Sequence, residues 1–390
     1  MLTQDQLSTL RGLFPYIASG RIYLNHAATA PLATPVVDAM VRNLQDRSAG
    51  KLETFSDDIT MIGELRQRIA ELIGAEHTSR IALQANTSEG VSVVAAGLRW
   101  RSGDRILLNT AEFPANVHPF LNVRRHGVEI DMLPAPEGQV SPEALLDALH
   151  SRTRLVALSA VQFLSGFRPD LATIGKICRE RGIVFAVDGI QAVGAVTIDV
   201  VGMKIDALAA GCQKWQLGPQ GGGFLYVTEE LQAQIQQAYL GWLSVKDPWK
   251  FFDYEQGPAP SARRYEPGTL PVPSLWGMHA ALGLLLEWGM PEVEERLLML
   301  TGTLQQMLRG AGLSLLTPSE TARRAGIITL QLPEKTDGRA LMRELQRRSI
   351  TASLREGYLR LSPHFYNTDE EMEITAEAIL ECTRPTPSRR

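Results

Sequence analysis

Between residues 60 and 230, short apolar runs alternate with segments that have the apolar spacing of amphipathic helices. One helix is predicted over Glu64–Gly74, where apolar residues form a single stripe and a glycine ends the pattern. Ser141-Pro142 and Asp170 open two more, because a capping side chain precedes each apolar stripe. The runs between them are predicted as strands over Arg80–Gln84, Arg105–Leu108, Val128–Met132, Arg154–Ser159, Ile183–Val187, Ala207–Ala209 and Gly223–Val227. This alternation is typical of a mostly parallel sheet covered by helices on both faces.

A stretch rich in proline and glycine, Gly257–Pro273, interrupts the alternation. The pattern after it is that of a smaller α+β unit. Its predicted elements are helices over Leu275–Trp288 and Val293–Leu308 and strands near Ile327–Leu332 and Tyr358–Leu361. We therefore expect an α/β protein with an N-terminal segment (1–20), a large domain (21–265), a smaller C-terminal α+β domain (266–383) and a disordered tail (384–390).

The chain has 390 residues, with 39 Lys and Arg against 43 Asp and Glu, so its formal net charge is −4. This balance gives no strong basic field for binding nucleic acid. No apolar run approaches the ~20 residues that span a bilayer, and the first residues, MLTQDQLSTLRGLF, show no secretory signal pattern. The three scattered cysteines, Cys178, Cys212 and Cys382, fit a reducing compartment. We expect a cytoplasmic enzyme without a metal site that binds neither nucleic acid nor a membrane.

Three groups of polar residues follow predicted strands, where ligands of such sheets bind. Asp188-Gly189-Ile190-Gln191 ends one strand, Lys214 follows another, and Asn86-Thr87-Ser88-Glu89-Gly90 joins a third to the apolar helix predicted over Val91–Leu98. Each group alone also fits a structural role. Asp188 could cap a turn, Lys214 could be a surface charge, and the third group could be a plain helix cap.

Taken together, the three groups indicate one kind of chemistry. Lys214 has Cys212, Trp215 and a glycine-rich turn as neighbours, and such confinement lowers the pKa of a lysine and suits it to Schiff-base formation. The N–H groups and hydroxyls that open the helix after residue 86 would bind an anion. Asp188 would pair with a protonated pyridine nitrogen. A phosphate cradle, an acid and a confined lysine are what pyridoxal phosphate requires.

The segment VDGIQAVGAVTIDVVGMKIDALAAGCQKWQLGPQGGGFLYV contains both Asp188 and Lys214. It resembles the class V branch of the fold type I pyridoxal-phosphate enzymes, which includes cysteine desulfurases, C–S lyases and isopenicillin N epimerase. The resemblance extends from RIYLNHAATAPL near the start of the chain to YLRLSPHFYNTDEEM near its end. It implies the fold type I transferase fold, with a mostly parallel seven-stranded sheet in the large domain. It also implies a homodimer with shared active sites.

The resemblance further implies a role for individual residues around the cofactor. Lys214 would be the catalytic lysine that forms the internal aldimine and moves the α-proton. Asp188 would pair with the pyridine nitrogen, and Gln191 would contact the ring hydroxyl. Phe113 would stack over the ring, and Gln162 would face its hydroxyl side. The phosphate would be held by Thr87, Ser88 and Gln213, and in the neighbouring subunit by Gly268 and Thr269.

On the substrate side, Arg360 matches the arginine that binds the α-carboxylate with its bidentate fork. His26 and Ala28, in LNHAAT, would also contact the substrate. The candidates for a second acid or base are His26, His118, His364 and Tyr265, each of which also fits a structural role. Arg263-Arg264 would either bind a second carboxylate or form a solvated basic pair.

The chain departs from the desulfurase branch in three places. Gln213 stands where that branch has His before the lysine, and Phe113 stands where His often stacks on the ring. The stretch SLREGYLRLSPHF is too short for the loop that bears the persulfide-forming cysteine, and it contains no cysteine. We therefore expect a C–S lyase that acts by β-elimination on an amino acid. The alternatives are an epimerase like isopenicillin N epimerase, or a class V aminotransferase. A non-catalytic binding protein is disfavoured, because Lys214 and Asp188 are both present.

Overall fold

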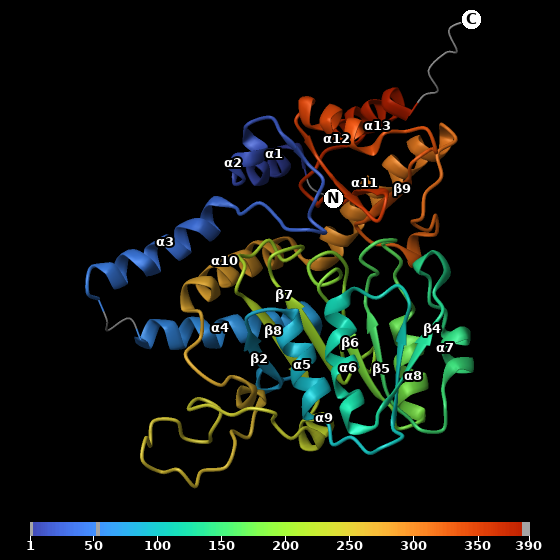
Figure 1. The fold of residues 1–390 in the computed structure, drawn as a ribbon. Coiled ribbons are helices and arrows are strands. Elements are labelled where there is room, and N and C mark those ends of the chain that lie inside the picture. The colour runs from blue at the N-terminus through green and yellow to red at the C-terminus, as the bar shows by residue number, and fades with distance from the viewer. Residues whose placement is uncertain (1–2, 52–54, 384–390) are drawn as a thin grey trace, which may run out of the picture.

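The computed structural model describes residues 3–51 and 55–383, and the predicted tail, 384–390, lies outside them. In Figure 1 a large sheet with its helices occupies the lower part of the molecule, and a smaller unit that includes α12 and α13 lies above it. Within the described residues, no helix is long and apolar enough to cross a membrane.

The large sheet has seven strands in the order β2-β8-β7-β6-β5-β3-β4. Strand β8 runs opposite to the other six, because both of its neighbours pair with it antiparallel while the remaining pairs are parallel. The strands are β2 (Ile81–Gln84), β3 (Arg105–Asn109), β4 (Glu129–Leu133), β5 (Thr153–Ser159), β6 (Val184–Asp188), β7 (Ala207–Gly211) and β8 (Gly223–Val227). Each bound lies within two residues of its prediction, so the mostly parallel α/β sheet is confirmed.

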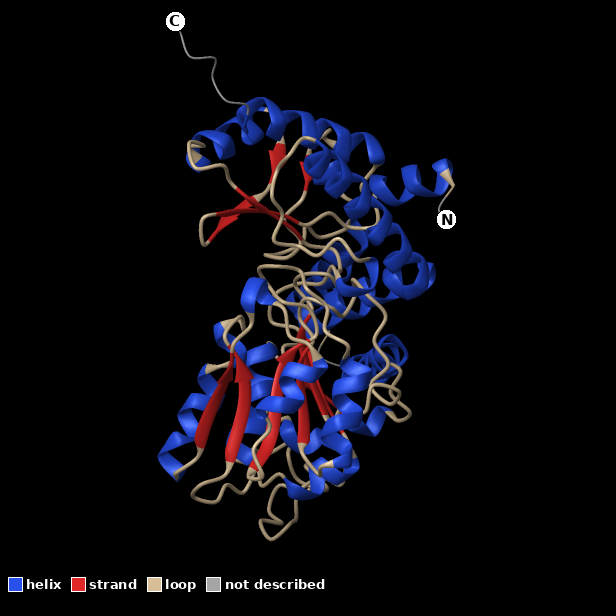
Figure 2. Cartoon of the chain, turned by 90° about the vertical axis from the view of Figure 1, so that its right-hand side faces the viewer, coloured by secondary structure: helices blue, strands red, loops and turns tan. Residues whose placement is uncertain are grey.

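Helices cover both faces of this sheet, as Figure 2 shows. They are α4 (Phe55–Ile73), α5 (Thr87–Gly97), α6 (His118–Asn122), α7 (Pro142–Ala148), α8 (Leu171–Glu180), α9 (Glu229–Gln234) and α10 (Val272–Trp288). Successive strand residues point to opposite faces. In β6, Phe185 and Val187 therefore join the core shared with α4, α8 and α10, whereas Val184 and Ala186 join the core shared with α5. Burial on both faces is why these strands are continuous apolar runs.

The predicted capping residues begin their helices as expected. Asn86 accepts a hydrogen bond from the backbone N–H of Glu89 at 3.0 Å and so fixes the first turn of α5. Ser141 caps α7, and Asp170 caps α8 in the same way. The start of α5 matters for function, because it directs free N–H groups beyond the end of β2.

The C-terminal region forms a three-stranded antiparallel sheet in the order β11-β12-β9, with its own apolar core. Its elements are α11 (Met290–Gly310), β9 (Ile328–Gln331), α12 (Gly338–Arg347), β10 (Ile350–Thr351), β11 (Ser353–Arg355), β12 (Tyr358–Leu361) and α13 (Asp369–Thr383). This is the smaller C-terminal α+β unit that the sequence predicts, except that the helix predicted over Leu275–Trp288 is α10 and packs with the large sheet instead.

The beginning of the chain packs against both units. It contains α1 (Gln4–Gly12), α2 (Pro15–Ala18), β1 (Ile22–Tyr23) and α3 (Thr34–Ser48). Strand β1 pairs in parallel with β10, and Arg11 forms an ion pair with Glu371 of α13 at 2.6 Å. Helix α10 packs on α3 and α4. The domain boundaries near residues 20 and 265 stay predictions, since these contacts cross both.

Replacing Glu266 by alanine is expected to destabilise the protein by about 3–5 kcal/mol, the cost of breaking a buried ion pair. The buried Glu266 carboxylate accepts hydrogen bonds from Arg66 at 2.6 and 2.7 Å and from the backbone N–H of Leu83 at 2.7 Å. The variant leaves all of these donors without an acceptor. Urea unfolding measures the change, and Glu320→Ala, which removes an exposed pair with Arg323, should cost about 0–1 kcal/mol. Equal losses in the two variants would contradict this account.

Candidate active site

A cavity of about 680 Å³ lies beyond the carboxyl ends of the strands of the large sheet, and the hairpin of β11 and β12 closes it from the small unit. Its lining comes from segments that follow β2, β3, β5, β6 and β7. Of the residues predicted for the site, it is lined by Ala28, Thr87, Ser88, Phe113, Asp188, Gln191, Gln213, Lys214 and Arg360.

Asp188 ends β6, and its buried carboxylate has one unsatisfied oxygen. Oδ1 accepts a hydrogen bond from the Ile190 N–H at 2.9 Å, whereas Oδ2 has no partner among the described residues. Burial, and to a smaller extent the nearby Glu112 carboxylate, raise the pKa of this carboxyl, whereas the Ile190 N–H and Lys214 lower it, and the net value is about 6. An ionised carboxylate in this position is stabilised by a cationic N–H donor.

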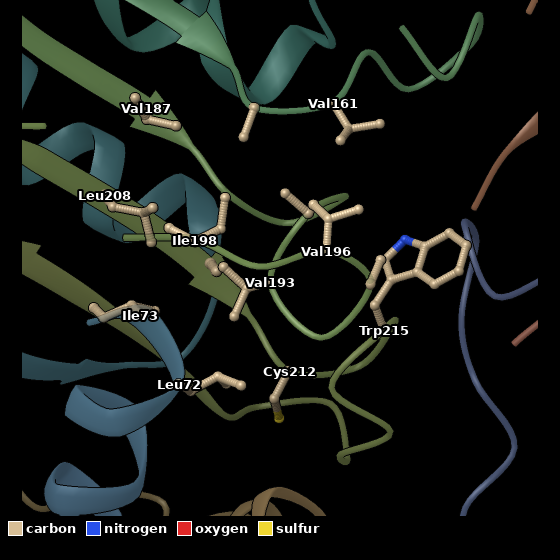
Figure 3. Packing of buried hydrophobic residues seen from close by; sticks show 14 of the residues in the cluster. Leu72, Ile73, Val161, Val187, Val193, Val196, Ile198, Leu208, Cys212 and Trp215 are labelled. Carbon is tan, nitrogen blue, oxygen red and sulfur yellow. The ribbon is translucent and has the colours of Figure 1, made fainter. Parts of the chain in front are cut away.

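Lys214 follows β7, and burial lowers the pKa of its ammonium group to about 8, although Asp188 raises it. Its Nζ lies 5.8 Å from the centre of the Phe113 ring. The residues on either side of Lys214 are fixed in the core: Cys212 donates from Sγ to the Pro219 carbonyl at 3.0 Å, and Trp215 is completely buried. Figure 3 shows Cys212 and Trp215 among the apolar side chains that surround them. The confinement predicted for the lysine is thus present.

Thr87 and Ser88 begin α5 at the edge of the cavity, with Gln213 also in its lining. The Thr87 hydroxyl accepts a hydrogen bond from the Gly211 N–H at 2.9 Å, which joins the helix to the end of β7. Gly90 permits this close packing, because a Cβ there would lie 2.8 Å from that of Ala209. Hydroxyls and N–H groups at a helix start are suited to binding an anion, so the position of Thr87 and Ser88 is compatible with the predicted phosphate site.

Glu112 is a buried member of the site that the sequence analysis did not select. Its carboxylate accepts five hydrogen bonds, two of them from Ser159 and the others from Asn109, Asn116 and Gln162. Gln162 therefore uses its amide N–H₂ on Glu112, and its Oε1 is left buried without a partner. Asn109, Glu112 and Asn116 are polar residues that directly follow the strand predicted over Arg105–Leu108. Their spacing is the sequence signal that could have identified Glu112.

Arg360 enters the cavity from β12 and is almost completely buried. Its Nη1 donates to the Phe163 carbonyl at 2.8 Å, and its Nε has no partner among the described residues. Burial and, to a smaller extent, the positive charge of Arg355 together lower the pKa of the guanidinium to about 10. Arg355 and Glu356, at the tip of the same hairpin, also line the cavity and were not predicted.

Several predicted residues lie elsewhere in this chain. Gly268 and Thr269 are outside the cavity lining, and Thr269 is exposed. His26 is buried behind the wall, where Nδ1 donates to the Ser362 carbonyl at 2.8 Å and Nε2 contacts the Tyr366 hydroxyl. Gln191 reaches the cavity, but its amide already bonds Trp215 at 2.8 Å and the Ala27 carbonyl at 3.0 Å. His26 and Gln191 thus fix the wall that holds Lys214.

The other candidates for a second acid or base also lie outside the lining, namely His118, His364 and Tyr265. His364 donates to the Trp215 carbonyl at 2.9 Å, and burial lowers the pKa of its ring to about 4. Arg263 donates to three backbone carbonyls, and Arg264 to that of Ala259. These bonds give the arginine pair a structural role in holding its own loop.

Comparison with known proteins agrees with this geometry. The sequence pattern of the family described as Aminotransferase class-V matches residues 22–374. The chain belongs to the class-V aminotransferase family. A probable cysteine desulfurase of Methanothermobacter thermautotrophicus is 28% identical, with 92% of this chain and 94% of that protein covered. The isopenicillin N epimerase of Streptomyces clavuligerus is 31% identical, with 82% and 84% covered.

Solved structures of the cystine C–S lyase C-DES are similar over the whole fold. Its complex with the reaction product cysteine persulfide superposes with a TM-score of 0.86 at 25% identity, covering 95% of this chain and 100% of that one. Another structure of C-DES holds glycine covalently linked to its pyridoxal-phosphate cofactor. This class-V protein is a pyridoxal-phosphate-dependent enzyme. The residues fit the cofactor, since the unsatisfied Asp188 oxygen, the α5 cradle, the Phe113 ring and Lys214 border one cavity.

The capture of pyridoxal phosphate by the apoprotein should accelerate with rising pH and level off above pH about 8. Only a neutral lysine attacks the aldehyde, and the pKa of Lys214 lies near 8 instead of 10.5. Stopped-flow absorbance of the cofactor between pH 6.5 and 10 measures the rate. Free Nα-acetyl-lysine is the control, and its rate should still be rising at pH 10. A protein rate that also rises to pH 10 would contradict a lowered lysine pKa.

Proposed function

We propose that this enzyme is a C–S lyase that converts a cysteine-derived amino acid and water into a thiol, pyruvate and ammonium. The α-proton and the sulfur substituent leave in turn, and water then replaces the amino group, so no external oxidant or reductant is required. Pyridoxal phosphate supplies the chemistry by accepting the electron pair of the Cα–H bond into its cationic ring.

Each active-site residue has a definite task in this proposal. Lys214 Nζ takes the proton from Cα, and in its protonated form it can donate that proton to the departing sulfur. Asp188 pairs through Oδ2 with the pyridine nitrogen and keeps it protonated. Arg360 holds the α-carboxylate and so orients the Cα–H bond towards Lys214. Phe113 stacks on the ring and excludes water from one face.

The observation that carries the proposal is that, among the described residues, no cysteine joins Lys214 in the cavity lining. Cys178 and Cys212 are buried, and burial raises the pKa of both thiols to about 12. Cys382 lies on α13, outside the lining. An enzyme that stores sulfur as a persulfide needs a reactive thiolate beside the substrate. β-Elimination does not, and the whole-chain similarity to the lyase C-DES favours it.

We also propose that the enzyme works as a homodimer in which the partner completes the phosphate site. The exposed Thr269 and its neighbour Gly268 contribute nothing to the cavity of their own chain. Exposed aromatic residues on the preceding loop, among them Trp249 and Phe252, give that side an apolar surface. Sedimentation of the holoenzyme measures the assembly, and a monomer with full activity would overturn this part of the proposal.

An epimerase is the second candidate, because the Streptomyces clavuligerus epimerase is 31% identical to this chain. Epimerisation requires a proton donor on the face of the substrate opposite Lys214. Glu356 is the exposed carboxylate in the cavity lining and the group available for that role within one chain. Glu112 accepts five hydrogen bonds, and Asp188 pairs with the ring nitrogen in our proposal. Neither carboxylate is therefore available as the second proton donor.

Product analysis of the cofactor-loaded enzyme separates these reactions. The enzyme is incubated in deuterated water with L-cysteine, L-cystine and S-substituted cysteines, and the products are identified by mass spectrometry. Pyruvate with a released thiol, sulfide or persulfide is expected. Deuterium at Cα without cleavage would mean epimerisation, and a keto acid that keeps its carbon skeleton would mean transamination. Either outcome would overturn the lyase proposal.

A further inference from the structure

The hairpin that closes the cavity has a very tight turn. Strands β11 and β12 pair from Ser353 with Arg360 to Arg355 with Tyr358. Only Glu356 and Gly357 lie between them, with φ of 49° and 85°. Positive φ at both positions defines a type I′ turn, which matches the twist of the paired strands. The turn therefore fixes the register of the hairpin.

This register places two arginines on one face. Ser353 lies directly opposite Arg360, and Arg355 is two residues further along the same strand. Side chains two residues apart on a strand point to the same face, so Arg355 is the diagonal neighbour of Arg360. Both side chains line the cavity.

Arg355 has an unused guanidinium. Within the described part of the chain, its side chain makes no ion pair and no hydrogen bond, and Glu356 beside it is not paired with it. Five arginines of the same C-terminal unit are paired with carboxylates: Arg296, Arg323, Arg343, Arg347 and Arg348. Arg355 is exposed at the mouth of the cavity, and its charge still lowers the pKa of both Arg360 and Lys214.

Two like charges on one face of a hairpin repel each other. The proposed function assigns Arg360 to the α-carboxylate and gives Arg355 no role. An anion between the cavity and the hairpin tip would offset the repulsion, and a guanidinium binds a carboxylate with two parallel hydrogen bonds. The side chain of a substrate held by Arg360 at one end is the group that would supply this anion.

We propose that Arg355 binds a carboxylate at the far end of the substrate side chain, and that the enzyme prefers cysteine conjugates that carry one. This inference rests on the proposed function, because it assumes that an amino acid is held by Arg360 beside Lys214. Arg355 is thus a specificity-determining residue, while the bond to be cleaved lies between the two anchored ends.

Two probes of nearly equal shape test the preference, namely S-carboxymethyl-L-cysteine and S-carbamoylmethyl-L-cysteine. The first ends in a carboxylate, and the second ends in an uncharged amide at the same position. The apparent dissociation constant of each is read from the change in cofactor absorbance on stopped-flow mixing with the holoenzyme. The acid should bind at least about tenfold more tightly than the amide, within the range measured for charged hydrogen bonds. Arg355→Met should bring the ratio of the two constants close to one, and Arg343→Met on exposed α12 should leave it unchanged.

The outcomes separate this inference from the proposed reaction. A ratio near one in the wild-type enzyme, or a preference that persists in Arg355→Met, would overturn the role of Arg355. A preference for the acid that depends on Arg355, without release of thiol from either probe, would retain the inference and overturn the lyase proposal. Probes that leave the absorbance unchanged would overturn both.

Discussion

Lys214→Ala is expected to lower the rate of product formation by about 10²–10⁴-fold, because it removes the group that moves the α-proton. The same change should abolish covalent retention of the cofactor. Borohydride reduction followed by mass spectrometry of the intact protein measures that retention. The wild-type chain should carry one added pyridoxyl phosphate at Lys214, and the variant should carry none there.

The matched control is Lys176→Ala, which removes an exposed lysine whose ammonium lies 3.9 Å from Glu180 on α8. It should change neither retention nor rate. The Lys214→Ala protein should also fold, because burial disfavours the charged form of Lys214 and the substitution removes that group. A folded Lys214→Ala protein that retained both covalent cofactor and turnover would contradict the assignment of Lys214.

Asp188→Asn is expected to slow turnover by about 150- to 5000-fold. The change leaves the ring nitrogen without its counter-charge, and breaking a buried charge pair costs about 3–5 kcal/mol. Steady-state kinetics at saturating cofactor measure the loss. Asp170→Asn is a suitable control, because Asp170 caps α8 and is absent from the cavity lining. Equal rates for wild type and Asp188→Asn would remove Asp188 from the cofactor site.

The same substitution should change how the stability of the apoprotein depends on pH. Burial raises the pKa of Asp188 from 3.8 to about 6, so the folded state favours the protonated acid. Its contribution to stability is therefore fully present below pH about 4 and is lost as the pH rises through about 6. Urea unfolding of both apoproteins at pH 4 and 7 measures this. The free energy of unfolding should fall more in wild type than in Asp188→Asn over that range, and parallel changes would contradict the raised pKa.

The central sheet and the cofactor side of the site could be predicted from sequence because their signals are local. Each strand is a continuous apolar run between turn residues, and Asp188 directly follows such a run. The start of α5 is equally local, since Asn86 caps a helix that the apolar pattern already indicates.

The substrate side depends on pairings between distant segments. Arg355 shares a face with Arg360 only because Glu356 and Gly357 form a two-residue turn, and that register is not visible in the composition of the segment. Glu112 gains its role from donors on two segments, its own after β3 and a distant one at the end of β5. His26 looked like an acid or base by residue type alone, but its ring is enclosed by groups that follow β12.

During synthesis, Ile22 leaves the ribosome 328 residues before Ile350, the residue with which it pairs. At about 5–20 residues per second, β1 waits roughly 15–65 s for β10. The strands from β2 to β8 are all available within the first 227 residues, so the sheet that carries Asp188 and Lys214 can form during this wait. Arg360 emerges only after β10. A nascent chain can thus place Asp188, Lys214 and the start of α5 in one sheet before it acquires Arg360, the residue that we propose binds the substrate.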